Sequence, residues 1–232
     1  MEIEKFEFFS GLTSAELGEM KKLLSELEFK KGDILFHEGE PPAHLWFVVE
    51  GEVKVFKEYA SGKSAIMGIF GVGGTVAEAA IIDGKAYPAS CQAVTNVKVA
   101  RMKRDDALRI MTSNSKIALR IMMGLSSKLR TITSDLGSMS VLSVIRRLSR
   151  FLLKLSDKMG VKEKDGIRFE LFLTRKDMAE CIGTSFEVAV RALGKLQSDN
   201  VLEIDGKKVL IKEIEELERL AGEMDRSEDG ED

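Results

Sequence analysis

The sequence predicts an α+β protein with three parts in order: a small antiparallel β jelly roll, a long coiled-coil dimerisation helix and a winged helix-turn-helix. Three patterns indicate this. Short strand-like runs separated by glycines come first, a heptad pattern of apolar residues follows, and two short helices with a hairpin behind them come next. We expect the parts to span residues 1–107, 108–139 and 140–224, followed by an acidic tail at 225–232.

Composition places the chain among ordinary globular proteins, with 232 residues, 44% hydrophobic and 31% charged. No run approaches the roughly 18 apolar residues of a membrane span. The first residues lack the layout of a signal peptide, so we expect a cytoplasmic protein with no membrane contact. Cys91 and Cys181 fall in different predicted domains. A structural disulfide is therefore disfavoured, and each is expected to pack in a core.

The first domain is expected to open with a helix and then to change to strands. Thr13 and Glu16 form a capping-box pattern that begins a helix running to about Leu27. Many short apolar runs with glycine turns at nearly regular spacing then favour a small antiparallel barrel or jelly roll. The expected strand segments are 34–36, 45–49, 53–55, 65–70, 89–94 and 97–102.

A stricter repeat lies between residues 111 and 139. Its seven-residue steps are Met111, Ala118, Leu125, Ile132 and Met139, with Ser115, Met122, Leu129 and Leu136 four residues after each of the first four. Such a seam needs a partner helix, and a single copy implies a parallel homodimer with a stem on the order of 40 Å long. Alternatively this face packs on the jelly roll, although Ile117, Leu119 and Ile121 already offer that domain a second apolar side.

Residues 173–197 are typical of two short helices joined by a tight turn, after a linking helix expected to begin at Ser140. Thr174 with Asp177 is a capping pattern, Gly183 reverses the chain, and Ser185 caps the second helix. The pattern predicts a helix-turn-helix.

Two polar residues share one face of the second helix. Glu187 and Arg191 lie four residues apart, where a recognition helix meets base edges in the major groove. Arginine can pair with guanine through two hydrogen bonds, and glutamate can accept one from cytosine. The alternative is a helical hairpin with a solvated Glu–Arg pair.

The flanking sequence favours DNA binding. Two short apolar runs surround Asp205-Gly206, which predicts a hairpin directly behind the recognition helix, a wing. Residues 140–212 contain 15 Lys and Arg against 10 Asp and Glu, a basic balance that suits a phosphate backbone. Residues 213–232 contain 2 against 10 and are expected to form an acidic amphipathic helix and then the tail.

This order of parts resembles the Crp/Fnr family of bacterial transcription regulators over nearly the whole chain. Three passages are similar to the family: residues 32–55 to its strand–turn–strand start, residues 76–90 to its effector-pocket loop, and residues 185–197 to the recognition helix of its Fnr branch. The resemblance implies a cyclic-nucleotide-binding-like sensor domain, a homodimer, an inverted-repeat operator in double-stranded DNA, and RNA polymerase as a partner.

The resemblance also implies DNA-binding roles for residues of the helix-turn-helix. Glu187 and Arg191 fall on the base-reading Glu and Arg, and Arg175 on a backbone-contacting Arg. Phe186 stands where the Crp branch has an Arg, and Val190 replaces a small or hydroxyl residue of the Fnr branch, which suits a thymine methyl group. The expected DNA-binding residues are Arg175, Ser185, Phe186, Glu187, Val190, Arg191 and Lys195.

The sensor loop departs from the cyclic-nucleotide members, which carry a Gly-Glu for the ribose and an Arg-Ser for the phosphate. Here Glu78 follows Ala77, and Tyr87-Pro88 stands near the place of Arg-Ser. A buried phosphate without a cation or an array of donors is costly, so cyclic AMP is disfavoured. The cysteine cluster of iron–sulfur Fnr proteins is also absent from the sequence, which excludes that cluster.

What remains resembles the branches that respond to haem and nitric oxide, including regulators of nitrate respiration and of hybrid-cluster protein genes. The expected effector pocket, which would accept a largely apolar ligand such as haem, is Glu78, Tyr87, Pro88, Ala89, Ile132 and Thr133. Candidate haem or metal ligands are His37, His44, Cys91, Met122 and Met123, each of which also has a simpler role as an exposed or packing side chain.

The sequence therefore predicts an effector-gated, homodimeric DNA-binding regulator and not an enzyme. A cyclic-nucleotide-responsive activator is the nearest alternative. A jelly-roll metalloenzyme needs several converging His or carboxylate ligands, and the two histidines, His37 and His44, form no His-x-His pair. A protein-interaction adaptor with a degenerate reader would lack salt-dependent DNA binding.

Overall fold

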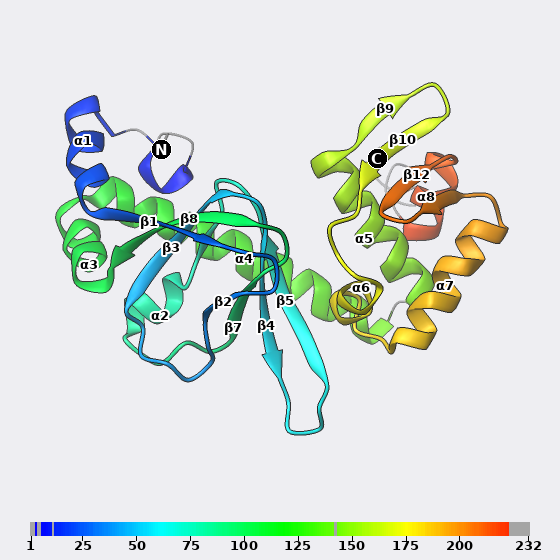
Figure 1. Cartoon of the computed structure of the whole chain (residues 1–232), viewed down its shortest axis with the longest axis horizontal. Coiled ribbons are helices and arrows are strands. Elements are labelled where there is room, and N and C mark those ends of the chain that lie inside the picture. Colours follow the sequence, from blue (N-terminus) through cyan, green and yellow to red (C-terminus); the bar gives the residue numbers. More distant parts are fainter. Residues whose placement is uncertain (1–2, 4–5, 11, 142, 223–232) are drawn as a thin grey trace, which may run out of the picture. The chain divides into compact units, whose positions relative to one another are not determined.

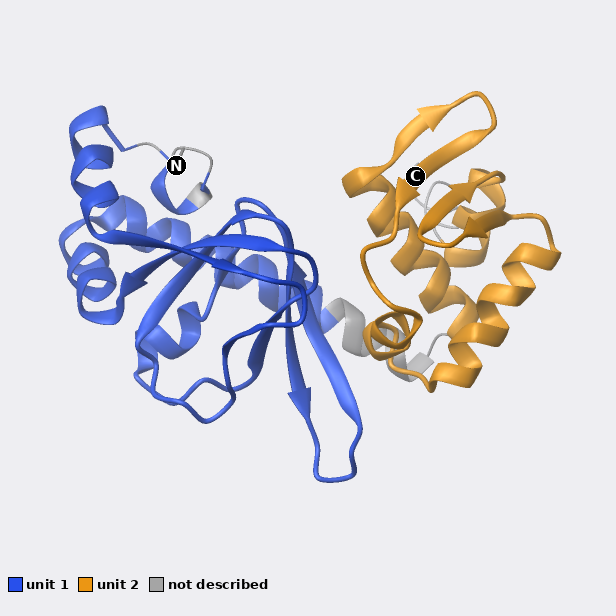
Figure 2. Cartoon of the chain, in the orientation of Figure 1, with its two compact units in different colours: residues 1–133 blue, residues 134–232 orange. Residues whose placement is uncertain are grey.

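The computed structural model describes residues 3, 6–10, 12–141 and 143–222, and the chain divides into two compact units, residues 1–133 and 134–232 (Figures 1 and 2). The predicted α+β class is confirmed, with an N-terminal β domain, a long helix and a C-terminal helix-turn-helix beside a small sheet. No helix among these residues is long and apolar enough to cross a membrane.

Two four-stranded antiparallel sheets form the first unit, with strand orders β1-β8-β3-β6 and β2-β7-β4-β5. Their strands are β1 (Leu24–Phe29), β2 (Ile34–Phe36), β3 (His44–Glu50), β4 (Val53–Glu58), β5 (Ser64–Phe70), β6 (Thr75–Val76), β7 (Ser90–Ala93) and β8 (Val97–Lys103). The helices of this part of the chain are the 3-10 helix η2 (Glu7–Phe9), α1 (Ser14–Lys22), α2 (Glu78–Asp83), α3 (Arg104–Ser113) and α4 (Ser115–Val141).

Strand β3 has a core on each of its faces. Trp46 and Val48 point between the two sheets, whereas Leu45 and Phe47 join a second core that includes N-terminal phenylalanines and residues of α2, α3 and α4. All four side chains are buried. This explains why the strand has a continuous apolar run instead of an alternating one.

The first helix is shorter than the capping pattern and apolar spacing predict. The capping box of Thr13 and Glu16 is confirmed, but α1 ends at Lys22, and the expectation of a helix to Leu27 is wrong. Residues Leu24–Phe29 form β1 instead, paired along the full length of β8 from Met102 to Val97. Pairing with an open sheet edge outweighs the helical spacing of the leucines.

The expected stem over residues 108–139 is also not one helix. Its start belongs to α3, and Asn114 is extended, with φ −132° and ψ 100°. The Asn114 side chain accepts from the amides of Lys116 and Ile117, at 3.1 and 3.3 Å, and so begins α4. Met111 therefore lies on α3, outside the stem helix. Because α4 continues to Val141, Ser140 does not begin the next helix.

The second unit contains the helix-turn-helix and its wing. Its elements after α4 are α5 (Val144–Met159), β9 (Val161–Glu163), β10 (Gly166–Glu170), α6 (Arg175–Cys181), α7 (Phe186–Ser198), β11 (Leu202–Asp205), β12 (Lys208–Ile211) and α8 (Ile214–Ala221). The sheet has the order β11-β12-β10-β9, and its β9–β10 hairpin is an addition to the predicted elements. The expected tail at 225–232 lies outside the described residues.

Candidate nucleic-acid interface and sensor site

A complete capping box positions α6, the first helix of the helix-turn-helix. The backbone amide of Thr174 donates to the Asp177 carboxylate at 2.9 Å, and the Asp177 amide donates to the Thr174 hydroxyl at 3.1 Å. The buried Asp177 thus satisfies the free end of α6. Arg175 is the first residue of this helix and remains exposed, where it can meet a phosphate.

The turn and the second helix follow from two more local features. Gly183 adopts a φ of 64°, which favours glycine, and the Ser185 hydroxyl accepts from the Val188 amide at 3.4 Å to cap α7. The inner face of α7 is buried through Ala189, Ala192, Leu193 and Leu196. Packing of this face fixes which residues α7 presents outward.

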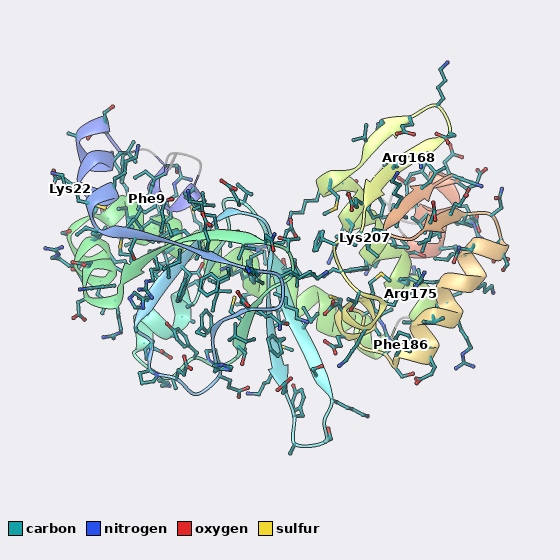
Figure 3. All side chains as sticks on the ribbon, in the orientation of Figure 1. Phe9, Lys22, Arg168, Arg175, Phe186 and Lys207 are labelled. Carbon is teal, nitrogen blue, oxygen red and sulfur yellow. The ribbon has the colours of Figure 1, made fainter. Side chains whose placement is uncertain are left out.

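The outer face of α7 carries the predicted base-reading residues. Glu187, Arg191 and Lys195 are exposed, Val190 is half-buried, and Phe186 leaves 49% of its surface exposed at the first turn. Figure 3 marks Phe186 and Arg175, at the starts of the two helices.

Glu187 is held in its ionised form. Its pKa is lowered by a hydrogen bond from its own backbone amide, by a hydrogen bond from Ser185 and by the charge of Arg191. An ionised carboxylate only accepts hydrogen bonds, so Glu187 fits the amino group of a cytosine or adenine and repels a phosphate.

Three arginines on α5 form hydrogen bonds to the helix-turn-helix and to the end of α8. Arg146 and Arg150 both donate through Nε to the carbonyl oxygen of Ala221, at 3.2 Å each, at the end of α8. Arg147 donates to the carbonyl oxygen of Gly183 in the helix-turn-helix at 3.3 Å. Part of the basic charge counted from the sequence therefore has hydrogen-bond partners within the second unit.

The wing adds cations that the set of expected site residues lacks. Asp205 pairs with Lys208, so the turn is the two residues Gly206 and Lys207, with Gly206 at φ 58°. Lys207, marked in Figure 3, and Lys208 are both exposed. Their place at the tip of a hairpin behind the recognition helix is the signal by which sequence reasoning could have found them.

The sensor loop places Glu78 at the start of α2, after Ala77. Lys128 of α4 reaches this point: its Nζ lies 2.6 Å from Glu78 Oε1 and 2.8 Å from the carbonyl oxygen of Thr75, and 4.8 Å from the ring centre of Phe70. Fifty residues separate Lys128 from Glu78, so no local pattern in the sequence reveals the pair.

The other expected pocket residues lie in different environments. Tyr87 and Ala89 are buried in the first unit, and Tyr87 is only 3% exposed. Pro88 is exposed, and its carbonyl oxygen lies 3.4 Å from Lys57 Nζ. Ile132 and Thr133 are exposed on α4. Within this set, Glu78 is the residue that an ion pair joins to the stem helix.

The candidate haem or metal ligands are also dispersed. His37 is exposed after β2, and His44 is half-buried at the start of β3, where burial and then the charges of Arg101 and Lys103 lower its pKa. Burial raises the pKa of Cys91 to about 12, which disfavours the thiolate that binds metals. Met122 and Met123 are exposed on α4. No group of three or more His, Cys, Asp or Glu residues among those described could hold a metal ion.

Comparison with known families assigns a separate domain to each of the two parts of the chain. Residues 26–114 match the cyclic nucleotide-binding domain, and residues 146–220 match the Crp-like helix-turn-helix domain. The chain belongs to the Crp/Fnr family of transcription regulators. It is a regulator and not an enzyme, as the sequence predicts.

Relatives of this Crp/Fnr protein match along almost the whole chain. The CRP-like cAMP-activated global transcriptional regulator of Mycobacterium tuberculosis is 27% identical over 213 residues, which are 92% of this chain and 95% of that protein. The structure of the c-di-GMP responsive global regulator CLP of Xanthomonas campestris has a TM-score of 0.74 at 25% identity, covering 86% of this chain and 99% of that one. FixK2 from Bradyrhizobium japonicum shares the fold, with a TM-score of 0.76 at 19% identity and coverage of 85% and 96%.

Proposed function

We propose that this protein is an effector-gated homodimer that binds an inverted-repeat operator and regulates transcription with RNA polymerase in the cytoplasm. The observation that carries the proposal is the outer face of α7, where Glu187, Arg191 and Lys195 are exposed on a helix whose opposite face is buried. A capped, rigidly packed helix with exposed base-reading side chains fits the major groove of DNA.

Each reader residue has a distinct role in this proposal. Arg191 pairs with guanine, and Glu187 accepts from a base amino group. Phe186 and Val190 make apolar contacts, of the kind that a thymine methyl group offers. At the starts of α6 and α7, Arg175 and Ser185 bind the phosphate backbone of the DNA. Phosphates also lie near Lys195 and near the wing cations Lys207 and Lys208.

The stem helix supplies the dimer. Its inner side packs on the first unit through Ile117 and Ile121, with Leu125 half-buried against the same core. Leu119, Met122, Met123, Leu129 and Ile132 are exposed. Leu119 was expected on the inner side and is exposed instead. An exposed apolar stripe on one helix fits a second copy, and two half-sites would then lie about 34–36 Å apart.

Haem, with nitric oxide as the signal, is the first candidate effector. It is supported by the sequence of the sensor loop and by its small apolar residues, including Ala79, Ala80 and Pro88. A cyclic nucleotide is the second candidate, and two observations favour it. Lys128 places a cation beside Glu78, which the sequence argument against a phosphate did not include, and the Mycobacterium tuberculosis relative is cAMP-activated.

Selection from random double-stranded DNA tests DNA binding directly. We expect a two-fold symmetric motif, bound with an affinity that falls steeply as salt increases. Recovery of no motif, together with salt-independent binding, would favour the adaptor alternative.

Two titrations separate the effectors. Haem binding is expected to give a Soret band that shifts with nitric oxide, whereas calorimetry with cyclic AMP at micromolar protein is expected to give no heat. A tight cyclic AMP isotherm would reverse the order of the two candidates, and a spectrum of free haem throughout would remove haem.

A further inference from the structure

The ion pair between Glu78 and Lys128 joins the sensor loop to the stem helix. Both side chains are largely withdrawn from water, with 12% of Glu78 and 31% of Lys128 exposed. The ammonium group also binds the Thr75 carbonyl oxygen and lies over the Phe70 ring. It therefore contacts β5, β6 and α2 at once. Pairs in such surroundings are screened less than surface pairs, and their loss leaves a desolvated charge.

The backbone next to this pair is strained. Ala77 adopts the left-handed conformation, with φ 80° and ψ 9°, and its side chain offers no cap to α2. This conformation is unfavourable for a residue other than glycine, and such strain persists only where neighbouring contacts impose it. The pair of Lys128 with Glu78, directly after Ala77, is such a contact.

Helix α2 also shares an apolar core with α4 and is hydrogen-bonded to α3. Ile81 is completely buried in the same core as Ile117 and Ile121 of α4, and its carbonyl oxygen accepts from Arg104 Nε at 3.0 Å. Apolar contacts therefore hold α4 from Ile117 to Leu125, and the ion pair of Lys128 holds it about one turn later. The later contact is the polar one, which a charged ligand can exchange.

We propose that the Lys128–Glu78 pair is a latch that fixes α4 to the β6–α2 corner until an effector displaces it. This inference rests on the proposed gating function. A ligand that opens the latch must replace both interactions, since either charge left alone and desolvated is costly. Whichever of the two candidate effectors binds must then supply an anionic group for Lys128 and a hydrogen-bond donor for Glu78.

Opening the latch releases the part of α4 that carries Leu129 and Ile132, two exposed apolar residues of the proposed dimer stripe. An effector with unequal affinity for the latched and open forms shifts the population between them. The latch therefore connects ligand binding to the dimer helix. We expect it to restrain DNA binding by the effector-free protein.

The test compares Lys128→Met with Lys128→Arg, which keeps the charge, and with Lys116→Met, the same change at an exposed lysine on α4. Amide hydrogen exchange is measured on the full-length protein without effector or DNA. We expect Lys128→Met to speed exchange in residues 124–133 and 75–80 by roughly tenfold, and both controls to stay near wild type. Glu78→Gln is expected to match Lys128→Met, with no further increase in the double variant.

Affinity for the selected operator is the second measurement. Effector-free Lys128→Met is expected to bind about tenfold more tightly than wild type. Unchanged exchange in Lys128→Met would overturn the latch itself, and faster exchange with unchanged or weaker DNA binding would overturn its regulatory role. Failure of the wild-type protein to bind any DNA would instead overturn the proposed function, and the exchange result would still decide whether the latch exists.

Discussion

The Tyr87 hydroxyl group forms two hydrogen bonds with the backbone of His44, donating to its carbonyl oxygen at 3.1 Å and accepting from its amide at 3.2 Å. The ring of Tyr87 stacks on Phe36, with centroids 4.1 Å apart. These contacts fasten the segment before β7 to the first residue of β3. They give Tyr87 a structural role in the jelly roll, at a position expected from the family resemblance to face the effector.

Removing the Tyr87 hydroxyl should therefore destabilise the first unit. Tyr87→Phe leaves two backbone groups of His44 without these partners and should cost about 1–3 kcal/mol in the free energy of unfolding. Urea denaturation measures the change. Tyr59→Phe is the control, because Tyr59 is 49% exposed. Equal midpoints for Tyr87→Phe and wild type would contradict this role.

The residues proposed to contact DNA should separate into those that bind bases and those that bind the phosphate backbone. Arg191→Ala should alter the selected DNA motif at one position and cost on the order of 1–3 kcal/mol in affinity for the wild-type operator. Selection of the motif by sequencing measures this directly. The same motif from Arg191→Ala and wild type would show that Arg191 does not read a base.

Arg175 is the matched comparison, because it is an exposed arginine at the start of the other helix. Arg175→Ala should weaken binding to all sequences alike and reduce the slope of log affinity against log salt by about one. A changed motif in Arg175→Ala would assign it to base reading instead.

How far the sequence predicts this site depends on the range of the interactions. The caps at Thr174 and Ser185 and the wing hairpin are local, and the structure has both caps where the pattern indicates and the wing turn at Gly206-Lys207, one residue later than Asp205-Gly206. Strand β1 was missed because its reason to form is β8, which lies more than 60 residues further along the chain. Lys128 was missed for the same reason, since its partners are at residues 70, 75 and 78.

The stem shows a third case, in which the spacing of the apolar residues could not give the side on which the helix packs. A heptad pattern includes Leu125 and Leu129 equally, yet Leu125 packs against the first unit and Leu129 is 65% exposed. Seven-residue spacing cannot say which side of a helix a neighbouring domain covers. The side chains of Leu136 and Met139, the last two residues of the predicted seam, lie outside the described part of the chain.

Dimerisation is therefore best tested at Met122 and Leu129, which are 56% and 65% exposed. Met122→Asp with Leu129→Asp should give monomers in sedimentation, because two charges would face each other across an apolar helix pair. Lys116→Asp with Thr131→Asp, at exposed polar positions of α4, is the control and should remain dimeric. A dimeric Met122, Leu129 double variant would refute the stem assignment.

His44 should make stability depend on pH. Its pKa in the folded protein is lowered from the ordinary value of 6.5, first by burial and then by Arg101 and Lys103. The unfolded chain therefore takes up a proton first as the pH falls below 6.5, and folded stability decreases over that window. His44→Gln removes the titration, so the difference between its urea midpoint and that of wild type should change between about pH 7.5 and about pH 5. A constant difference would show that His44 titrates normally.

The capping box of α6 links local structure to DNA binding. Thr174→Ala removes the hydroxyl that accepts from the Asp177 amide and leaves the buried Asp177 carboxylate with one hydrogen-bond partner fewer to order it. Loss of such a cap costs about 0.5–2 kcal/mol, and it should loosen the helix that begins with Arg175. Thr174→Ser keeps the hydroxyl and is the control. We expect Thr174→Ala to lower the melting temperature of the second unit and to weaken operator binding, while Thr174→Ser changes neither. Equal melting and equal binding in the two variants would mean that the cap does not position Arg175.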